Sequence, residues 1–308
     1  MSDVIQSLSI CCPAKKCINH CETCTSRQHT NPYLNKYNGD HTETLEYWDN
    51  VIKRMRYAQS KGCTTVMLTG SNEPQQDRRW LEALWLAMRS LPEPFTNIEI
   101  QTTGAFIDDD YLQFFKSIGV TTVAVSTFNI FSDKVNRLIE HCPDDNLCIE
   151  DLCSMVKSHG LNLRICVNVT DYALEGAFLQ HRTLETREAQ VILTRCATLD
   201  ADQVTFRKMW SVEGTPEGDW IKEHCTDLST TILHQVKEDV KKDGQLIYRL
   251  PYGAERYDYM GFSIVIDTDS MAKEGILKDT SEVVLKYYII REDGKMYSSW
   301  DSKASLVF

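Results

Sequence analysis

Five of the twelve cysteines in this 308-residue chain lie between Cys11 and Cys24. Three of them, Cys17, Cys21 and Cys24, form a C-x3-C-x2-C run. Cysteine thiolates are the usual ligands of iron–sulfur clusters. Three thiolates on one short loop can hold three irons of a cubane 4Fe–4S cluster, and the fourth iron is then open to a substrate or cofactor.

A structural zinc site built from Cys12, Cys17, Cys21 and Cys24 is the alternative. Structural zinc sites are usually closed and four-coordinate, and they combine two short cysteine pairs separated by a longer spacer. Here all four candidates sit on one loop, and no second pair follows. The spacing therefore favours the cluster, with zinc as the competing interpretation.

The other cysteines are scattered, and most are expected to be small core residues. In a reducing compartment they are not expected to form disulfides. A second metal site from Cys142, Cys148 and Cys153 is only weakly indicated, because their spacing matches no specific pattern. The remaining four are Cys63, Cys166, Cys196 and Cys225.

The composition is that of an ordinary globular protein, with 42% hydrophobic and 25% charged residues. No apolar run is long enough to span a bilayer, and the N-terminus lacks the basic-then-apolar pattern of a secretion signal. We therefore expect a cytoplasmic protein with no membrane partner. The net charge of −11 argues against a broad nucleic-acid-binding surface, although it leaves room for a local basic pocket.

Hydrophobic periodicity predicts alternating strands and helices through the first 243 residues. Strands are expected at 4–10, 64–68, 97–101, 121–126, 161–169 and 204–209, and helices at 44–60, around 80–88, and at 108–119, 134–142, 149–159, 183–199 and 228–244. Such alternation predicts parallel βα units, whose functional loops lie at the carboxyl ends of the strands.

After Gly244 the pattern changes to strands without long helices. They are expected at 245–250, 262–267, 283–290, 295–300 and 305–308, and Asp293-Gly294 is a hairpin signal. We place a boundary here. Residues 1–243 would form the βα domain with the cysteine loop at 11–24, and residues 244–308 would form a small, mostly antiparallel segment that caps the substrate side.

Four features in order resemble the radical S-adenosylmethionine (radical SAM) superfamily. They are the cysteine loop after the first strand, a Gly-x-x-Glu-Pro turn after the second, the βα repeat, and a serine that ends the fourth strand. The resemblance covers roughly residues 8–209. It implies an α/β fold, a partial (β/α)6 TIM-like barrel. It also implies a single 4Fe–4S cluster on Cys17, Cys21 and Cys24, with SAM chelating the open iron.

The resemblance also implies that the turn Gly70-Ser71-Asn72-Glu73-Pro74 receives the SAM amino group. Glu73 is the natural acceptor, because a carboxylate offers only acceptors to an ammonium's donors. The structural alternative is that Glu73 and Pro74 simply begin a helix, where both residue types are favoured. Gly70 and Ser71 would supply the rest of this cofactor-binding turn.

Three further cofactor-binding positions follow from the resemblance. Ser126 matches a serine whose hydroxyl helps hold the cofactor, Asn168 matches a cofactor-facing strand position, and Arg137 could pair with the SAM carboxylate. Each has a structural alternative. Ser126 could only end a strand, Asn168 could be a satisfied polar residue, and Arg137 could lie on a solvated helix face.

Two positions depart from the family pattern. The family often places an aromatic residue just before the third cysteine, and this chain has Thr23 there. The family's Gly-Gly-Glu-Pro turn is one residue longer here, with Asn72 in place of the second glycine. Because asparagine tolerates left-handed backbone conformations, the turn can be kept, although the register of the amino-group contact becomes uncertain.

The implied reaction is reductive cleavage of SAM, which yields methionine and a 5′-deoxyadenosyl radical that takes a hydrogen atom from a substrate. An electron donor such as flavodoxin or ferredoxin would be required. No cysteine follows Cys225, which indicates a single-cluster enzyme. Aromatic and arginine side chains near the C-terminus favour a nucleoside, nucleotide or modified base as substrate. A peptide or amino-acid derivative is the alternative, and a non-enzymatic zinc-binding module is the second.

Overall fold

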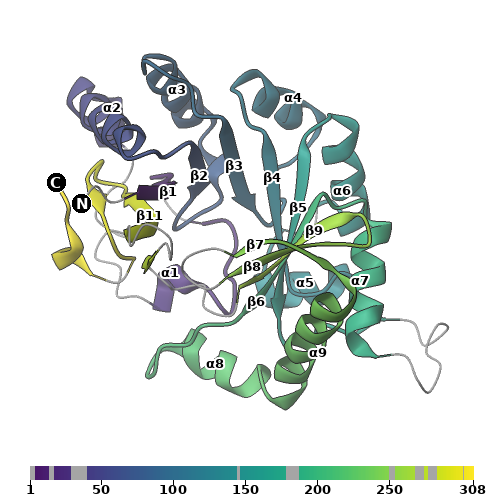
Figure 1. Cartoon of the computed structure of the whole chain (residues 1–308). Helices are drawn as coiled ribbons and strands as arrows, with labels where there is room; N and C mark the ends of the chain where they lie inside the picture. The colour runs from purple at the N-terminus through teal and green to yellow at the C-terminus, as the bar shows by residue number, and fades with distance from the viewer. Residues whose placement is uncertain are drawn as a thin grey trace.

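The computed structural model describes residues 4–13, 17–28, 40–143, 146–177, 187–249, 254–267, 274–276, 283–300 and 302–308. Its strands form one sheet in the order β10-β11-β1-β2-β3-β4-β5-β6-β9-β8-β7, with β12 paired to β11. The first six strands are neighbours and parallel, and helices cover their outer side (Figure 1). The predicted α/β partial barrel is confirmed.

The elements fall close to the predicted bounds. The barrel strands are β1 (Val4–Cys11), β2 (Thr65–Thr69), β3 (Asn97–Thr102), β4 (Thr122–Thr127), β5 (Asn162–Val169) and β6 (Gln203–Lys208). The helices are α1 (Thr25–Gln28), α2 (Leu45–Ser60), α3 (Arg78–Arg89), α4 (Asp109–Ser117), α5 (Asp133–Glu140), α6 (Ile149–Ser158), α7 (Glu188–Thr198), α8 (Pro216–His224) and α9 (Asp227–Asp243). Short 3-10 helices in the described ranges lie at Asp40–Glu43, Pro74–Gln76 and Lys303–Ser305.

Side-chain caps fix where the helices begin. The hydroxyl of Thr44 accepts from the Tyr47 backbone N–H at the start of α2, and the Asp108 carboxylate accepts from the Tyr111 N–H at the start of α4. Such caps satisfy amide groups that have no partner inside the helix. The helices then bury one face against the sheet, as Val51 and Met55 do from α2.

The C-terminal strands join the same sheet at both of its edges. They are β7 (Gln245–Arg249), β8 (Glu255–Tyr259), β9 (Phe262–Asp267), β10 (Glu274–Ile276), β11 (Val283–Ile290) and β12 (Met296–Tyr297). Strand β9 pairs in parallel with β6, and β11 pairs in parallel with β1 (Figure 1). The other C-terminal pairings are antiparallel.

Of two predictions for the C-terminal segment, one is confirmed and one is wrong. The predicted hairpin is confirmed, because Gly294 adopts φ +71° between the antiparallel strands β11 and β12. The predicted strand at 305–308 is wrong. Only Leu306 forms an isolated bridge, to Tyr297, since residues Lys303–Ser305 turn as a 3-10 helix.

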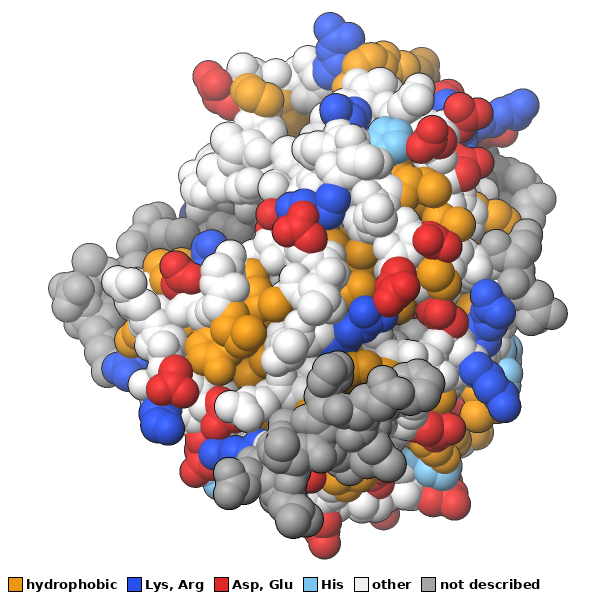
Figure 2. All heavy atoms as spheres, turned by 90° about the vertical axis from the view of Figure 1, so that its right-hand side faces the viewer, with side chains coloured by type: hydrophobic (Ala, Val, Ile, Leu, Met, Phe, Trp, Pro, Cys, Tyr) orange, Lys and Arg blue, Asp and Glu red, His pale blue; other side chains and the backbone are white. Residues whose placement is uncertain are grey.

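The helices and one face of the surface bear on membrane spanning and on nucleic-acid binding. No helix in the described ranges is long and apolar enough to cross a membrane. On the face drawn in Figure 2, lysine and arginine side chains are dispersed among acidic ones.

Candidate active site

A cavity of about 850 Å³ occupies the interior of the barrel. The cysteine loop, the turn after β2 and the inward positions of the strands line it. Of the nine site residues predicted from the sequence, eight line this cavity: Cys17, Cys21, Cys24, Gly70, Ser71, Glu73, Ser126 and Asn168. The ninth, Arg137, lines a smaller adjoining pocket.

The three cysteines are half-buried thiols on the wall of this cavity. Burial, together with the negative charge of Glu73, raises the pKa of Cys17 to about 11. Burial and the charge of Glu140 raise the pKa of Cys21 well above its usual value. The protein alone therefore does little to stabilise these two thiolates, and bound iron would supply the missing positive charge.

Backbone contacts hold the cysteine loop against helix α5. The backbone N–H of His20 donates to the carbonyl of Glu140 at 3.0 Å, and that of Glu22 donates to the carbonyl of Ile139 at 2.8 Å. The last carbonyls of a helix have no partner inside it, so these bonds satisfy both the helix carbonyls and the N–H groups of the loop. The loop is thereby docked on the carboxyl end of α5.

A second set of contacts ties the loop to α8 and to the segment after β6. Arg27 pairs with Glu217 at 2.6 Å, and its guanidinium also donates to the carbonyl of Cys21. The amide of Gln28 donates to the Trp210 carbonyl and accepts from the Val212 N–H. No local pattern predicts the contacts with Glu217, Trp210 and Val212, because these partners lie 190, 182 and 184 positions away.

The turn after β2 passes close to the end of β1. Gly70 adopts φ +136°, and a Cβ there would lie only 3.1 Å from the Cα of Cys11. Glycine is therefore required both by its conformation and by the close approach. The Gly70 carbonyl accepts from the Ser26 hydroxyl at 3.3 Å, which connects the turn to the end of the cysteine loop.

Asn72 does not adopt the left-handed conformation that we considered from the sequence. It is absent from the positive-φ residues of the described chain. Its side-chain amide instead donates to the Cys12 carbonyl at 2.9 Å, and so fastens the turn to β1. Ser71, next to it, donates its hydroxyl to Glu292 at 2.7 Å.

Glu73 is buried and surrounded by hydrogen-bond donors of its own chain. Its carboxylate accepts from the Asn19 amide at 3.0 Å, the Gln75 amide at 3.0 Å, the Thr102 hydroxyl at 2.5 Å, and the Thr103 backbone N–H and hydroxyl. Burial raises its pKa, and the bonds from Thr102 and Thr103 partly oppose that rise. These donors fill the roughly four acceptor positions of a carboxylate, so Glu73 joins the cysteine loop to β3.

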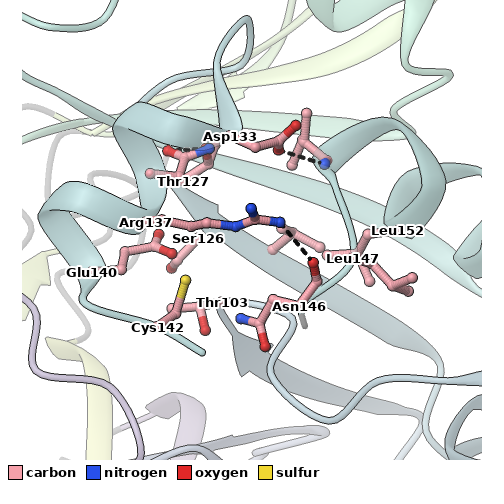
Figure 3. A pocket seen from close by; sticks show the side chains of 13 residues that line it. Thr103, Ser126, Thr127, Asp133, Arg137, Glu140, Cys142, Asn146, Leu147 and Leu152 are labelled. Carbon is pink, nitrogen blue, oxygen red and sulfur yellow. Dashed lines mark hydrogen bonds between the residues drawn. The ribbon is translucent and has the colours of Figure 1, made fainter. Parts of the chain in front are cut away.

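Ser126 and Arg137 both line a small pocket beside the main cavity (Figure 3). Arg137 extends across this pocket and donates to the Asn146 carbonyl at 3.1 Å, while its buried Nε has no hydrogen-bond partner among the described residues. It is half-buried, so the alternative of a fully solvated helix face does not describe it. Ser126 and Glu140 line both the pocket and the cavity.

Glu140 is a buried acid that the sequence analysis did not single out. Burial, and then the charge of Glu73, raise its pKa well above the usual range. In the part of the chain that the structure describes, one of its carboxylate oxygens has no hydrogen-bond partner. The residue ends helix α5, far in sequence from Cys17, Cys21 and Cys24, so its spacing from these cysteines could not have identified it.

The remaining cysteines do not assemble a second centre in the described part of the chain. Cys153 is in the core, where burial raises its pKa to about 12, and Cys148 caps α6. Cys12 is fully buried, and its thiol donates to the Pro74 carbonyl. Across the described ranges, no three His, Cys, Asp or Glu side chains converge to hold a single metal ion.

The donor set fits a cluster with a bound amino-acid-like cofactor. Three thiols and the turn at Gly70 line one large cavity. Glu140 and Arg137, on the wall of the cavity and of its adjoining pocket, each have a buried polar atom without a hydrogen-bond partner among the described residues. A cubane cluster takes one cysteine per iron, so its ligands need not converge on a single point. Room for SAM and for a substrate group remains in the same cavity.

No protein-family model and no curated protein matches the sequence. Solved structures do match its fold over most of the chain, and these structural neighbours are radical SAM enzymes. anSMEcpe with bound AdoMet is 14% identical, with a TM-score of 0.59 over 97% of this chain and 75% of that chain. SuiB of Streptococcus suis is 13% identical, with a TM-score of 0.56 over 96% of this chain and 60% of that chain.

Coproporphyrinogen III oxidase (HemN) of Escherichia coli, a radical SAM enzyme, is 13% identical, with a TM-score of 0.52 over 93% of this chain and 64% of that chain. The chain thus spans between 60% and 75% of the lengths of these three proteins. At such low identity the likeness establishes the fold alone. The chemistry has to be inferred from the residues of the site.

Proposed function

We propose that this chain, which has the fold of the radical SAM enzymes, is itself a radical SAM enzyme with a single 4Fe–4S cluster on Cys17, Cys21 and Cys24. The observation that carries the proposal is the joint placement of these three thiols and the Gly70–Glu73 turn on one internal cavity. When bound, the cluster and SAM supply a 5′-deoxyadenosyl radical for hydrogen abstraction.

The chain's own residues position and enclose that chemistry. The docking of the loop on α5 and the bonds of Glu73 fix the three thiols relative to the strand ends. Gly70, Ser71, Ser126, Asn168 and the half-buried Arg137 are the proposed contacts for SAM. Because donors of the chain itself occupy the acceptor positions of Glu73, we propose that its main role is to position the cysteine loop. Its effect on the SAM amino group would then be indirect.

A peptide or amino-acid derivative is the substrate class we favour. anSMEcpe has been solved with bound peptides, and SuiB with its precursor peptide SuiA. Most of the C-terminal aromatic and arginine side chains that suggested a nucleotide have structural roles. Tyr257 and Tyr297 are buried, Arg249 pairs with Glu255, and Arg291 stacks on Trp300 at 5.0 Å.

A nucleoside or nucleotide is the second candidate. Trp210, Tyr287 and Trp300 line the cavity, and aromatic faces can stack on a base. Under either reading, part of the C-terminal segment caps the substrate side, since Tyr248 of β7 and Arg256 of β8 also line the cavity. An external one-electron donor of the flavodoxin or ferredoxin type, and a reducing cytoplasm, complete the proposal.

The test is anaerobic reconstitution followed by reduction and addition of SAM. We expect iron and sulfide in near-equal amounts, and 5′-deoxyadenosine detected by mass spectrometry. Cys21→Ala should lose the cluster absorbance and the product, whereas Cys148→Ser, outside the cavity, should keep both. A colourless chain with one zinc would instead support the zinc-binding module. An intact cluster that neither binds nor cleaves SAM would overturn the proposed enzyme.

A further inference from the structure

The wall of the cavity formed by β6, β9 and β8 is polar. Strand β6 directs Gln203, Thr205 and Arg207 at alternate positions into the cavity. Register places Thr205 opposite Val265 of β9, and Val265 opposite Arg256 of β8. Thr205 and Arg256 therefore lie in one row across three strands, with Arg207 one row nearer the carboxyl end of β6.

Two of the described acidic side chains that line this cavity are already paired with other groups. Glu99 pairs with Arg164 at 2.5 Å, and Asp202 pairs with Lys157 at 2.7 Å. Arg207 and Arg256, by contrast, form no ion pair with any carboxylate in the described ranges. Among the side chains that the structure describes, neither guanidinium is paired with a carboxylate, although the chain is acidic overall.

Arg256 is held in place without being neutralised. Its Nε donates to the Ser263 hydroxyl at 2.7 Å, and its guanidinium lies 5.7 Å from the ring centroid of Tyr248. These two contacts orient the planar group while its terminal nitrogens keep their donor capacity. An oriented but unneutralised arginine suits bidentate recognition of an oxyanion.

Thr205 supplies an independent sign of a ligand. Its side chain is 5% exposed, and its hydroxyl has no hydrogen-bond partner in the described chain. Buried hydroxyl groups in folded proteins are nearly always paired, because an unpaired one costs desolvation energy. This hydroxyl lies on the cavity wall in the row of Arg256 and next to the row of Arg207, where it could donate a hydrogen bond to a bound oxyanion.

We propose that Thr205, Arg207 and Arg256 form a substrate subsite for an oxyanion, a carboxylate or a phosphate. The proposal rests on the proposed function, and it narrows the substrate to a molecule that carries such a group away from its reacting carbon. A peptide would offer an acidic side chain or a terminal carboxylate, and a nucleotide would offer its phosphate. The site is separate from Arg137, which lines the adjoining pocket and is our candidate for the SAM carboxylate.

The experiment is calorimetric titration of the reconstituted, SAM-saturated protein with two probes, glutarate and pyrophosphate, at constant ionic strength because salt screens such contacts. We expect saturable binding of at least one probe. Arg207→Gln should weaken it about tenfold or more, as loss of a charge-assisted bond predicts. Arg89→Gln, an exposed change on α3, is the matched control and should bind within about twofold of the parent chain.

The two probes distinguish the sources. Tighter binding of glutarate indicates a carboxylate substrate, and tighter binding of pyrophosphate indicates a phosphate. Arg207→Lys keeps the charge but loses the planar fork, so it should give intermediate affinity, and it serves if the glutamine variant does not fold. Equal binding by parent and Arg207 variants, no saturable binding of either probe, or displacement of SAM by the probes would each overturn the subsite.

Iron content and SAM cleavage are measured on the same sample, so the two proposals fail separately. Anion binding that depends on Arg207, in a chain whose intact cluster neither binds nor cleaves SAM, would refute the enzyme and keep the subsite. Cleavage of SAM without anion binding would do the reverse.

Discussion

At the scale of single residues, the buried carboxylate of Glu73 holds the cysteine loop against the end of β3. The sequence places it as the acceptor of the SAM amino group. In the structure its two oxygens are occupied by side chains from the cysteine loop and from the end of β3, including Asn19 and Thr103. Its first effect is therefore on the position of the loop that carries the cysteines.

Glu73→Ala should accordingly damage the cluster as well as SAM binding. The change leaves several buried donors unsatisfied, which costs about 2–4 kcal/mol of unfolding free energy. We expect a lower midpoint in chemical denaturation and a reduced iron content after reconstitution. An unchanged iron content combined with weaker SAM binding would instead assign Glu73 to the cofactor alone.

The residues that sequence could identify are those whose type and local spacing carry the chemistry. Cys17, Cys21 and Cys24 are defined by spacing, and Gly70 by its place in a turn. Thr205 and Glu140 could not be found this way, since their significance depends on burial and on missing partners. Those properties arise only when separate elements come together.

At the scale of elements, the hairpin of β7 and β8 depends on Glu255. This carboxylate lies 2.7 Å from the ammonium of Lys241 on α9 and 3.0 Å from Arg249 on β7, and it accepts from Tyr257 at 3.1 Å. Burial alone would raise the pKa of Glu255, but the bonds from Lys241 and Tyr257 outweigh it, and the pKa is lowered. The hairpin that carries Arg256 is thereby fixed to α9.

Glu255→Gln should destabilise the protein by about 1 kcal/mol at neutral pH, a typical value for a partly exposed ion pair. Since the pKa is lower in the folded state, this contribution is present above the unfolded value and is lost as pH falls through the folded value. Denaturation midpoints of parent and variant should therefore differ at pH 7 and converge below about pH 4. A constant difference across that range would contradict the pairing.

Elements with strong periodicity were predictable, and those without it were not. Helix α2 has a capping threonine and a regular buried face, so its bounds agree within one residue. Helix α8 was missed because it is nine residues long and Ile221 is its one buried large apolar side chain. Strand β8 (ERYDY) was missed because it is polar and only Tyr257 is deeply buried.

At the scale of the whole molecule, the C-terminal segment extends the barrel at both edges. Strand β11 pairs along β1 from Val4 to Ile10, and β9 pairs along β6 from Gln203 to Arg207. Eight neighbouring strands, from β11 through β9, are therefore parallel. The sequence predicted the change of pattern after Gly244. The pairing of β1 with β11, which joins Val4 to Val284, has no local signal in the sequence.

Removal of residues 244–308 tests the predicted boundary after residue 243. The fragment 1–243 would leave the edges of β1 and β6 without their partners and would uncover core side chains such as Ile10 and Phe206. Exposed apolar sheet edges promote aggregation, so we expect the fragment to lose cooperative thermal unfolding and to aggregate, with the full chain as control. A fragment that unfolds cooperatively and takes up iron would show that residues 1–243 are an independent domain. The C-terminal strands would then serve the substrate side alone.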